Sequence, residues 1–406
     1  METVDILIKN ANELLTLKGP NHQRTKSMMN DLGIIKNGCV AVKNGKIFDT
    51  GKNLTYKAKK TIDASGKTVL PGFVDPHTHI VFSGSREFEL DMKLKGYSYM
   101  DILNKGGGIF YTVEKTRKAS EEQLISESKK RLDNMLSYGT TTCEAKSGYG
   151  LDLETEMKIL KVQDKLNKSH DVDIVSTFLG AHAIPKNMDS EDFVEIVISD
   201  MIPKIANLAC FCDVFCEKDV FTVDQSRRIL EAGKKHGLTP KIHADEIVDT
   251  GGAGLAADVD AISADHLLRS NDKNLKKMVE KNVIAVMLPG TPFSLMMDEY
   301  ADARKMIDMG LSVALATDLN PNCYTENMQF MIQLACFNMN MTPAEAICAS
   351  TFNSACAINK NDKIGSIENG KNADIIILDC KNHMEVPYHF GINLVQQVIK
   401  KGEIVL

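Results

Sequence analysis

Four histidines and one aspartate of this 406-residue chain have the types and spacing of a metal site. His77 and His79 follow an apolar run, and residues two apart in a strand point to the same face, so the pair can present two imidazoles to one ion. His243, His266 and Asp318 each end or follow another apolar run. One HxH motif alone is a weak indication, but ionisable groups repeated at strand ends are hard to explain by packing. Imidazole and carboxylate ligands suit zinc or ferrous iron, and we predict a catalytic metal site.

Short apolar segments alternate with helical stretches through the middle of the chain. The helical stretches include Glu121–Leu136 and Gln225–His236, and this alternation is typical of a parallel sheet. Eight such units over about 290 residues predict an α/β fold of the TIM-barrel type, in which functional side chains collect at the carboxyl ends of the strands. The predicted strands are Val69–His79, Thr140–Ala145, Ile174–Gly180, Phe211–Cys216, Pro240–His243, Ala261–Ala264, Val283–Leu288 and Ser312–Ala316.

Both ends of the chain contain short β elements instead. Asp5–Ile8 and Cys39–Val42 are apolar runs near the start, and Ala373–Leu378 and Leu394–Ile399 are similar runs near the end. Chain termini often lie close together, so the two ends can pair in one small sheet domain. We therefore predict a composite β domain from residues 1–66 and 357–406, and a barrel domain over 67–356.

Composition and charge exclude several classes of protein. With 48 basic and 54 acidic residues the net charge is −6. Proteins that bind nucleic acids usually carry a basic face, and proteins that bind anionic membranes usually carry a polybasic segment. No apolar stretch approaches the 18 residues of a transmembrane helix, and the acidic start does not have the pattern of a secretory signal. Ten scattered cysteines are ordinary for a protein whose thiols stay reduced. We expect a cytoplasmic protein that binds neither nucleic acid nor membranes.

The ordered set of motifs resembles the amidohydrolase superfamily and, within it, the imidazolonepropionase family. The similarity runs essentially from end to end, and although any one motif could occur by chance, the ordered set is specific. It implies a distorted TIM barrel with a β-sandwich built from both termini. The motifs that carry the resemblance are Pro71–His79, Phe82–Glu89, Lys146–Leu151, Leu179–Ala183, His243–Glu246 and Thr317–Pro321.

The resemblance implies a function and roles for the site residues. It implies one divalent ion, zinc or iron, that activates water for hydrolysis of the cyclic amide C–N bond of 4-imidazolone-5-propanoate, giving N-formimidoyl-L-glutamate in histidine degradation. Asp318 would also carry a proton from the water to the leaving ring nitrogen, His266 would donate to the oxyanion, and Glu246 would combine substrate binding with acid–base work. The implied metal ligands are His77, His79, His243 and Asp318.

The small anionic substrate needs a cation and further polar contacts. Arg86, seven residues after His79, fits because a guanidinium binds a carboxylate in a bidentate manner. At Asn322 and Cys323 the chain departs from the family, which more often has a glycine and a small hydroxyl residue there, so the resemblance does not define a side-chain role for Cys323. The residues expected to contact substrate are Arg86, Tyr149, His182, Glu246, Asn320, Asn322 and Cys323.

Alternative functions stay open at the level of sequence. Another amidohydrolase, such as a cytosine or guanine deaminase, would use the same ligands but would have less use for Arg86. A relative that serves only as a binding protein would usually have lost a ligand, and here all four are present. The cluster Cys210, Cys212 and Cys216 lacks the paired CxxC spacing of a zinc site. The resemblance favours a homodimer, and Gly106–Gly108 is a candidate hinge for a loop that closes over the site.

Overall fold

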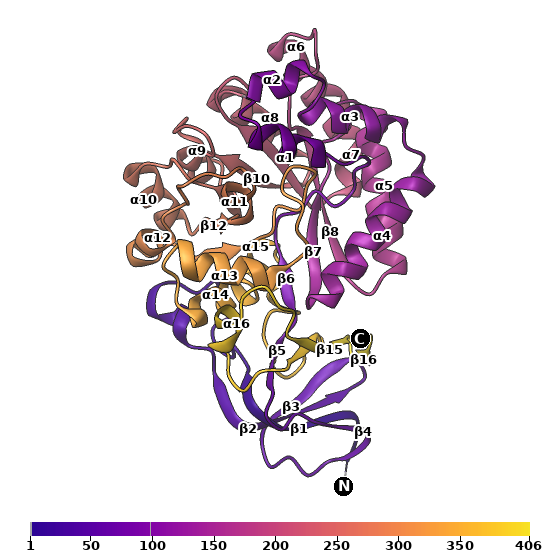
Figure 1. Cartoon of the computed structure of the whole chain (residues 1–406), viewed down its shortest axis with the longest axis vertical. Helices are drawn as coiled ribbons and strands as arrows, with labels where there is room; N and C mark the ends of the chain where they lie inside the picture. The colour runs from indigo at the N-terminus through magenta and orange to yellow at the C-terminus, as the bar shows by residue number, and fades with distance from the viewer. Residues whose placement is uncertain (1, 98) are drawn as a thin grey trace.

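The computed structural model describes residues 2–97 and 99–406, which form two eight-stranded sheets. One sheet is a parallel barrel from the middle of the chain, and the other is a mixed sheet to which both ends contribute. Figure 1 shows the barrel above the mixed sheet, with both termini beside the latter. The predicted fold, a TIM-type barrel with a separate β unit from both termini, is confirmed.

The mixed sheet is organised around its longest strand, β1. The strands are β1 (Thr3–Leu15), β2 (Ile34–Lys43), β3 (Lys46–Lys52), β4 (Lys57–Asp63), β5 (Thr68–Pro71), β14 (Ile375–Leu378), β15 (Val395–Lys400) and β16 (Glu403–Ile404). β1 pairs antiparallel with β2 and parallel with both β4 and β5, and β5 pairs with β14. Side chains alternate across a strand, so Ile6 and Ile8 of β1 enter the same core as Val40, Val42 and Ile375. This shared core joins the two ends of the chain.

The barrel strands follow one another in sequence order, each parallel to the next. They are β6 (Phe73–Asp75), β7 (Thr140–Lys146), β8 (Asp173–Ala181), β9 (Phe211–Cys216), β10 (Thr239–Ala244), β11 (Ser263–His266), β12 (Ile284–Met287) and β13 (Val313–Leu315). The first and last strands meet just beyond their carboxyl ends. There the Asp318 N–H donates to the His77 carbonyl at 3.1 Å, and the His79 N–H donates to the Leu319 carbonyl at 2.8 Å. These two bonds close the barrel beside the predicted metal ligands.

The prediction of one strand over Val69–His79 is wrong. The segment is divided between the two sheets, β5 in the mixed sheet and β6 in the barrel. The division falls at Gly72, whose N–H donates to the Asp374 carbonyl, and a Cβ at this position would lie 2.3 Å from the Thr141 side chain. The chain thus changes sheets where proline and glycine follow each other, and only the second piece carries the histidines.

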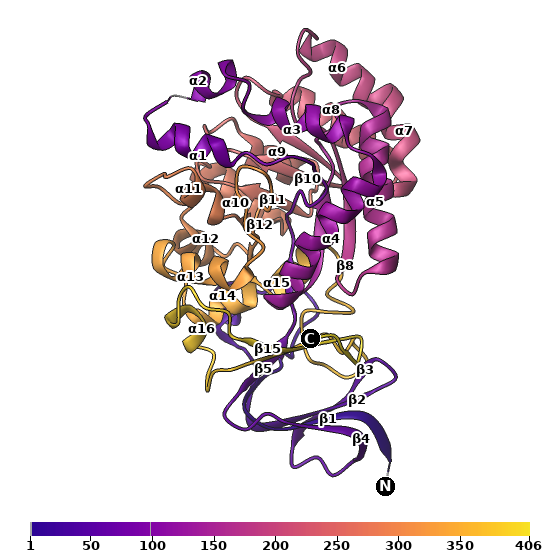
Figure 2. The same ribbon diagram turned by 45° about the vertical axis from the view of Figure 1, so that its right-hand side comes forward.

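Helices surround the barrel, as Figures 1 and 2 show. The predicted helices are confirmed as α4 (Glu121–Ser137) and α8 (Val223–Lys235), and the caps at their N-termini are Ser120 and Thr222. Such caps accept hydrogen bonds from otherwise unpaired N–H groups of the first turn. The other helices are α1 (Glu87–Leu94), α2 (Tyr99–Asn104), α3 (Ile109–Lys118), α5 (Leu153–Ser169), α6 (Ser190–Ile196), α7 (Ile202–Ile205), α9 (Gly252–Asp258), α10 (Asp272–Lys281), α11 (Gly290–Ser294), α12 (Ala303–Met309), α13 (Met328–Asn338), α14 (Pro343–Ala349), α15 (Phe352–Ala357) and α16 (Glu385–Tyr388).

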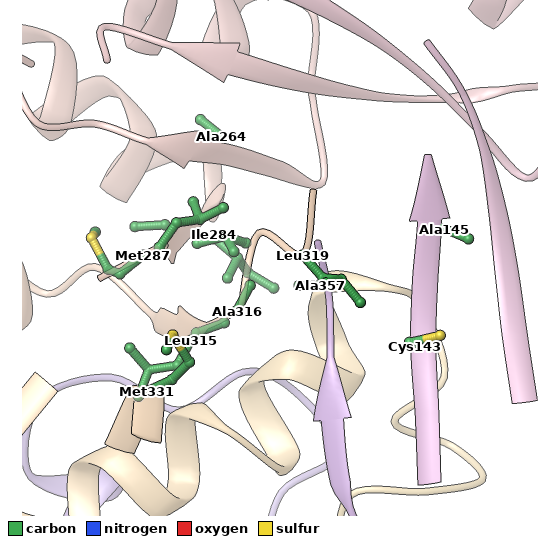
Figure 3. Close-up of a cluster of buried hydrophobic side chains, with 14 of the residues drawn as sticks. Cys143, Ala145, Ala264, Ile284, Met287, Leu315, Ala316, Leu319, Met331 and Ala357 are labelled. Carbon is green, nitrogen blue, oxygen red and sulfur yellow. The ribbon is translucent and has the colours of Figure 1, made fainter. Parts of the chain in front are cut away.

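The core between the barrel and its helices is apolar. Figure 3 shows part of it, where Ile284 and Met287 of β12, Leu315 of β13 and Met331 of α13 are buried in one cluster. The methionines therefore contribute to packing, as their adaptable side chains allow. Within residues 2–97 and 99–406, no helix has the length and apolar character needed to cross a membrane.

The connection from β6 to β7 is long enough to hold four helices, α1 to α4. In both views α1 lies close to α11, on the side of the barrel that carries the carboxyl ends of the strands. Gly106 and Gly108, between α2 and α3, have φ values of 87° and 79°, which glycine adopts readily. The hinge at Gly106–Gly108 stays a prediction.

Candidate active site

Three histidines converge at the carboxyl end of the barrel. His77 and His79 lie two and four residues after the end of β6, and His243 is the penultimate residue of β10. One nitrogen of each ring lies within 4.8 Å of the others, and all three side chains are buried. The ring centroids of His77 and His243 are 4.5 Å apart, and those of His77 and His79 are 5.3 Å apart. The two-residue spacing and the strand ends predicted from sequence thus place three imidazoles around one point.

The donor atoms of this cluster fit a divalent metal ion. Nε2 of His77 and Nε2 of His243 are buried and have no hydrogen-bond partner among the described residues. Buried polar atoms are normally satisfied, so unpaired imidazole nitrogens in one cluster indicate a site for a cation. Burial lowers the pKa of His77 and of His79 well below the ordinary value, so both rings are neutral, as metal binding requires.

Asp318 supplies a carboxylate beside the histidines. Its Oδ1 lies 3.5 Å from Nε2 of His77 and 3.6 Å from Nε2 of His79, and its Oδ2 accepts a hydrogen bond from the Thr291 hydroxyl at 2.6 Å. Asp318 has a φ of 54°, in the left-handed region. Asp75, at the end of β6, accepts hydrogen bonds from the hydroxyl and N–H of Thr317. This cross-strand link fixes the residue immediately before Asp318.

His266 and Glu246 form a pair beside the metal cluster. Nε2 of His266 is 3.7 Å from Oε2 of Glu246, and its ring centroid is 5.5 Å from that of His77 and 5.4 Å from that of His243. Burial lowers the pKa of His266 to about 4, so the ring is neutral and can donate only one N–H. Burial also raises the pKa of Glu246 to about 7. A carboxyl with such a pKa can exchange protons near neutral pH.

Two aromatic residues cover the other side of the cluster. His182 stacks on His79, with centroids 4.9 Å apart and planes inclined by 12°, and its Nδ1 is 3.0 Å from the Gly148 carbonyl oxygen. The Tyr149 ring is 5.3 Å from the His182 ring and 5.6 Å from the His79 ring. Burial lowers the pKa of His182 to about 3 and raises that of Tyr149 above its ordinary value. Both side chains are therefore uncharged hydrogen-bonding groups.

Arg86 lines a pocket of 980 Å³ that is not lined by the histidines but reaches the loop after Asp318 at Asn322 and Cys323. Glu89 already occupies one edge of the Arg86 guanidinium. Nε and Nη2 of Arg86 donate to the two carboxylate oxygens of Glu89 at 2.7 and 2.8 Å. Glu89 also accepts from the N–H of Gly108 at 2.7 Å. The bidentate grip expected for a substrate carboxylate is thus made with Glu89, and Nη1 is the nitrogen that makes no bond to the described part of the chain.

The loop after β13 contains the remaining expected contacts. Asn320 shapes this loop, because its side chain donates to the Asp318 carbonyl and accepts from the N–H groups of Asn322 and Cys323. Asn322 lines the pocket and accepts a hydrogen bond from Lys93 at 3.0 Å. Cys323 also lines it and is buried, with Sγ 3.5 Å from the Thr317 carbonyl oxygen. Asn320 thus positions Asn322 and Cys323, two of the residues expected to contact substrate.

Sequence reasoning missed two groups of residues. Lys93, from α1, lines the same pocket as Arg86, and burial lowers its pKa. Nothing in the sequence distinguishes it from Lys95, an exposed lysine just after the same helix. Asp213 and Asp265 lie next to His243 and His77, within strands rather than after them. Charged residues inside otherwise apolar strands are the signal that could have found the second group.

Neither the cysteine cluster near β9 nor Glu217, a carboxylate that could hold a second ion, belongs to a metal-site group among the described residues. Cys212 and Cys216 are buried in β9, and all ten cysteines are free thiols. Glu217, which follows β9, accepts hydrogen bonds from the N–H groups of Ile247 and Val248 and so holds a loop. Among the described residues, His77, His79 and His243 are the one group with the geometry of a metal site.

A family model described as the amidohydrolase family matches residues 68–405. The chain belongs to the amidohydrolase family. It is 51% identical over 414 residues to the imidazolonepropionase of Alkaliphilus metalliredigens, an alignment that covers 99% of this chain and 98% of that one. It is also 51% identical to the imidazolonepropionase of Geobacillus kaustophilus, with the same coverage, and 48% identical to that of Clostridium tetani, with 100% and 99% covered. The resemblance inferred from the motifs is confirmed, and the chain is a hydrolase.

Solved structures of similar fold are more distant in sequence. An adenosine deaminase from Xanthomonas campestris with bound zinc has a TM-score of 0.76 at 17% identity, covering 100% of this chain and 93% of that one. A guanine deaminase of E. coli has a TM-score of 0.72 at 15% identity, covering 98% and 99%. At these identities the likeness shows the fold alone. The deaminase alternative therefore gains no support from it.

Removing one histidine of the cluster should abolish tight metal binding. We expect His243→Ala to weaken zinc affinity by more than about 10- to 100-fold, the usual loss from removing even an outer-shell partner of a ligand. The measurement is a titration of metal-free protein with zinc in competition with a chromogenic chelator. His266→Ala is the control, because this histidine lies outside the cluster of three. Equal losses in both variants would contradict the assignment of the ligands.

Proposed function

We propose that this chain hydrolyses the cyclic amide C–N bond of 4-imidazolone-5-propanoate to give N-formimidoyl-L-glutamate, as a step of histidine degradation. The observation that carries the proposal is its identity of about one half to imidazolonepropionases over the whole chain, at 51% in Alkaliphilus metalliredigens. The site adds chemical support, because the loop from Asp318 to Cys323 joins the metal-binding cluster to a pocket lined by Arg86 and Lys93. A substrate that is both an amide and an anion needs both features.

We propose His77, His79, His243 and Asp318 as ligands of one divalent ion, either zinc or iron. Both ions accept nitrogen and oxygen ligands. An ion bound there lowers the pKa of water and polarises a carbonyl group. The second oxygen of Asp318 is held by Thr291, which fixes the carboxylate plane.

The roles of the protein groups follow from their protonation states. Asp318 takes a proton from the attacking water and returns it to the ring nitrogen as the C–N bond breaks, so that the water oxygen ends in the new carboxylate. His266 is neutral and donates an N–H to the oxyanion of the tetrahedral intermediate. Glu246, next to His266, accepts a hydrogen bond from a ring N–H of the substrate and can exchange a proton with that ring nitrogen. Asp318 and His266 thus act at the carbonyl group that is attacked, and Glu246 acts at the ring, from the ends of three different strands.

We further propose that Arg86, Tyr149, His182, Asn322 and Cys323 form the walls that bind the substrate. Nη1 of Arg86 is available for one oxygen of the propanoate group, while Glu89 holds the other edge of the guanidinium. The Tyr149 and His182 rings lie beside His79, and this position supports a contact of the Tyr149 hydroxyl and of His182 with the ring or the carboxylate of the substrate. Asn320 contributes by shaping the loop.

We also propose that the enzyme works in the cytoplasm.

A homodimer remains part of the proposal. Several large apolar side chains near α13 and α16 are exposed, which is the composition of a surface that another chain covers. Phe337 and Phe390 contact each other there, with ring centroids 6.1 Å apart. The other exposed apolar residues of this region are Met384, Tyr388 and Ile392.

Turnover of the proposed substrate is the direct test. Purified metal-loaded protein should consume freshly generated 4-imidazolone-5-propanoate faster than its spontaneous decay, with formation of the ring-opened product. Absorbance of the substrate and chromatography of the product give the two readouts. Cytosine and guanine are the comparison substrates, and release of ammonia from either at a higher kcat/KM would favour the deaminase alternative. No turnover above background with intact metal would refute the proposal.

The carboxylate-binding role of Arg86 can be separated from folding and from metal binding. We expect Arg86→Met to raise KM at least about 10-fold, because a hydrogen bond to a charged group contributes about 1.5–3 kcal/mol. Zinc content should not change. Lys95→Met, just after the same helix, is the matched control, since Lys95 is exposed and pairs only with Asp91 among the described residues. Loss of zinc in the Arg86 variant would show that the site is misassigned.

Glu246 should impose an acid limb on the pH profile. If the ionised carboxylate accepts the ring N–H, kcat/KM falls as the pH drops through the pKa of about 7, because the protonated form has lost its acceptor charge. Glu246→Gln should lower activity and remove this limb. Glu217→Gln should shift it to lower pH, because the charge of Glu217 raises the pKa of Glu246. A limb that is identical in all three proteins would exclude Glu246 as its source.

A further inference from the structure

A fully buried lysine lies among three carboxylates next to the metal cluster. Lys146 is the last residue of β7, and its Nζ is 2.9 Å from Oε1 of Glu144, 2.7 Å from Oδ2 of Asp213 and 3.3 Å from Oδ2 of Asp265. All four side chains are completely inaccessible to solvent. The carboxylates come from three different strands, β7, β9 and β11. One ammonium group therefore joins three strands of the barrel.

The oxygens that contact Lys146 are the same oxygens that contact two of the histidines. Oδ2 of Asp265 is 2.6 Å from Nδ1 of His77, and Oδ2 of Asp213 is 3.0 Å from Nδ1 of His243. A carboxylate next to one ring nitrogen of a histidine fixes the ring orientation and leaves the other nitrogen for a metal. In both rings that other nitrogen, Nε2, is buried and unpaired among the described residues. Asp265 makes a hydrogen bond with His77, whereas the contact of Asp213 with Nδ1 of His243 is an ion-pair distance without hydrogen-bond geometry.

We propose that Lys146 is a positioning residue for the metal centre, which holds Asp213 and Asp265 in the places from which they orient His243 and His77. Without the ammonium group, the carboxylates would be buried with less compensating charge, and a buried charge left unpaired is costly. They would then rotate away, and both ligand rings would lose their fixed orientation together. The proposal rests on the metal role of the three histidines.

The surroundings also exclude a different role for this lysine. A carbamylated lysine would place a negative charge against Glu144, Asp213 and Asp265, so Lys146 acts as an ammonium group. Burial alone would lower the pKa of Lys146, but the three carboxylates outweigh it and hold the pKa above its ordinary value. The lysine therefore contributes a fixed positive charge rather than a metal ligand.

Lys241 provides a matched control within the same network. It is also fully buried and contacts Oε2 of Glu144 at 3.0 Å. Its other hydrogen bonds go to the carbonyl oxygens of Pro76 and Ala357, and within the described part of the chain it forms no ion pair with Asp213 or Asp265. Replacing Lys241 removes a buried charge of the same kind without removing the link to the two histidine-bound aspartates.

The test compares Lys146→Gln and Lys146→Met with Lys241→Gln. Glutamine keeps a hydrogen-bond donor in the buried site, so this variant should fold where methionine does not. Metal-free protein is titrated with zinc alone against a chromogenic chelator, and folding is checked by circular dichroism and thermal unfolding. We expect the Kd for zinc to rise by about 10- to 100-fold in Lys146→Gln, as for other outer-shell partners of metal ligands, and by less than about 3-fold in Lys241→Gln.

A second comparison asks whether Lys146 acts through the aspartates. Lys146→Gln combined with Asp265→Asn should raise the Kd by clearly less than the product of the two single effects, because both changes break the same chain of contacts. Unchanged zinc affinity in folded Lys146→Gln, equal losses in the two lysine variants, or independent effects in the double variant would overturn the proposal. Failure of both Lys146 variants to fold while Lys241→Gln folds would also overturn it, and would make Lys146 a folding determinant instead. The zinc readout does not depend on the substrate, so failure of the proposed function would be seen separately.

Discussion

Closure of the barrel is the constraint on which the site depends. The two main-chain hydrogen bonds between residues 77–79 and 318–319 join the first strand to the last, and the same four residues include three of the proposed metal ligands. Because backbone hydrogen bonds allow little variation in distance, they set how far Asp318 lies from His77 and His79. Asp75 reinforces the junction through Thr317. The hydrogen bonds that close the barrel therefore also bring the proposed metal ligands together.

The buried charged side chains next to the histidine cluster favour a bound cation. Lys146 and Lys241 contribute two positive charges, and Glu144, Asp213 and Asp265 contribute three formal negative charges, all fully buried. Counted as ionised, these five side chains carry one excess negative charge, and Asp213 accordingly raises the pKa of the adjacent His243. In a medium of low polarity such an excess is unfavourable without a nearby cation. A divalent ion bound at the histidine cluster would supply it, and the buried network would then stabilise the bound ion.

Sequence predicted the parts of the site that obey strand geometry. The histidines and Asp318 were recognisable because packing alone seldom places ionisable residues at the ends of several apolar strands. The division of Val69–His79 between two sheets was not predictable, because it depends on the close approach of Gly72 to Thr141, a contact between residues far apart in the chain. Lys146 was visible in a motif, yet its partners are long-range ones that only the closed barrel brings together.

The expected contacts to substrate show the same limit more sharply. Arg86 was predicted from its charge and its place after the first strand, and it does line the pocket. Its partner Glu89, one helical turn later, changes what the charge can do, because it takes the bidentate edge of the guanidinium. Glu89 also reaches the N–H of Gly108, so the orientation of Arg86 is coupled to the glycine-rich segment between α2 and α3. The presence of an arginine thus predicts that an anion can bind. The residues that contact the arginine determine which edge of its guanidinium is available and how that edge is oriented.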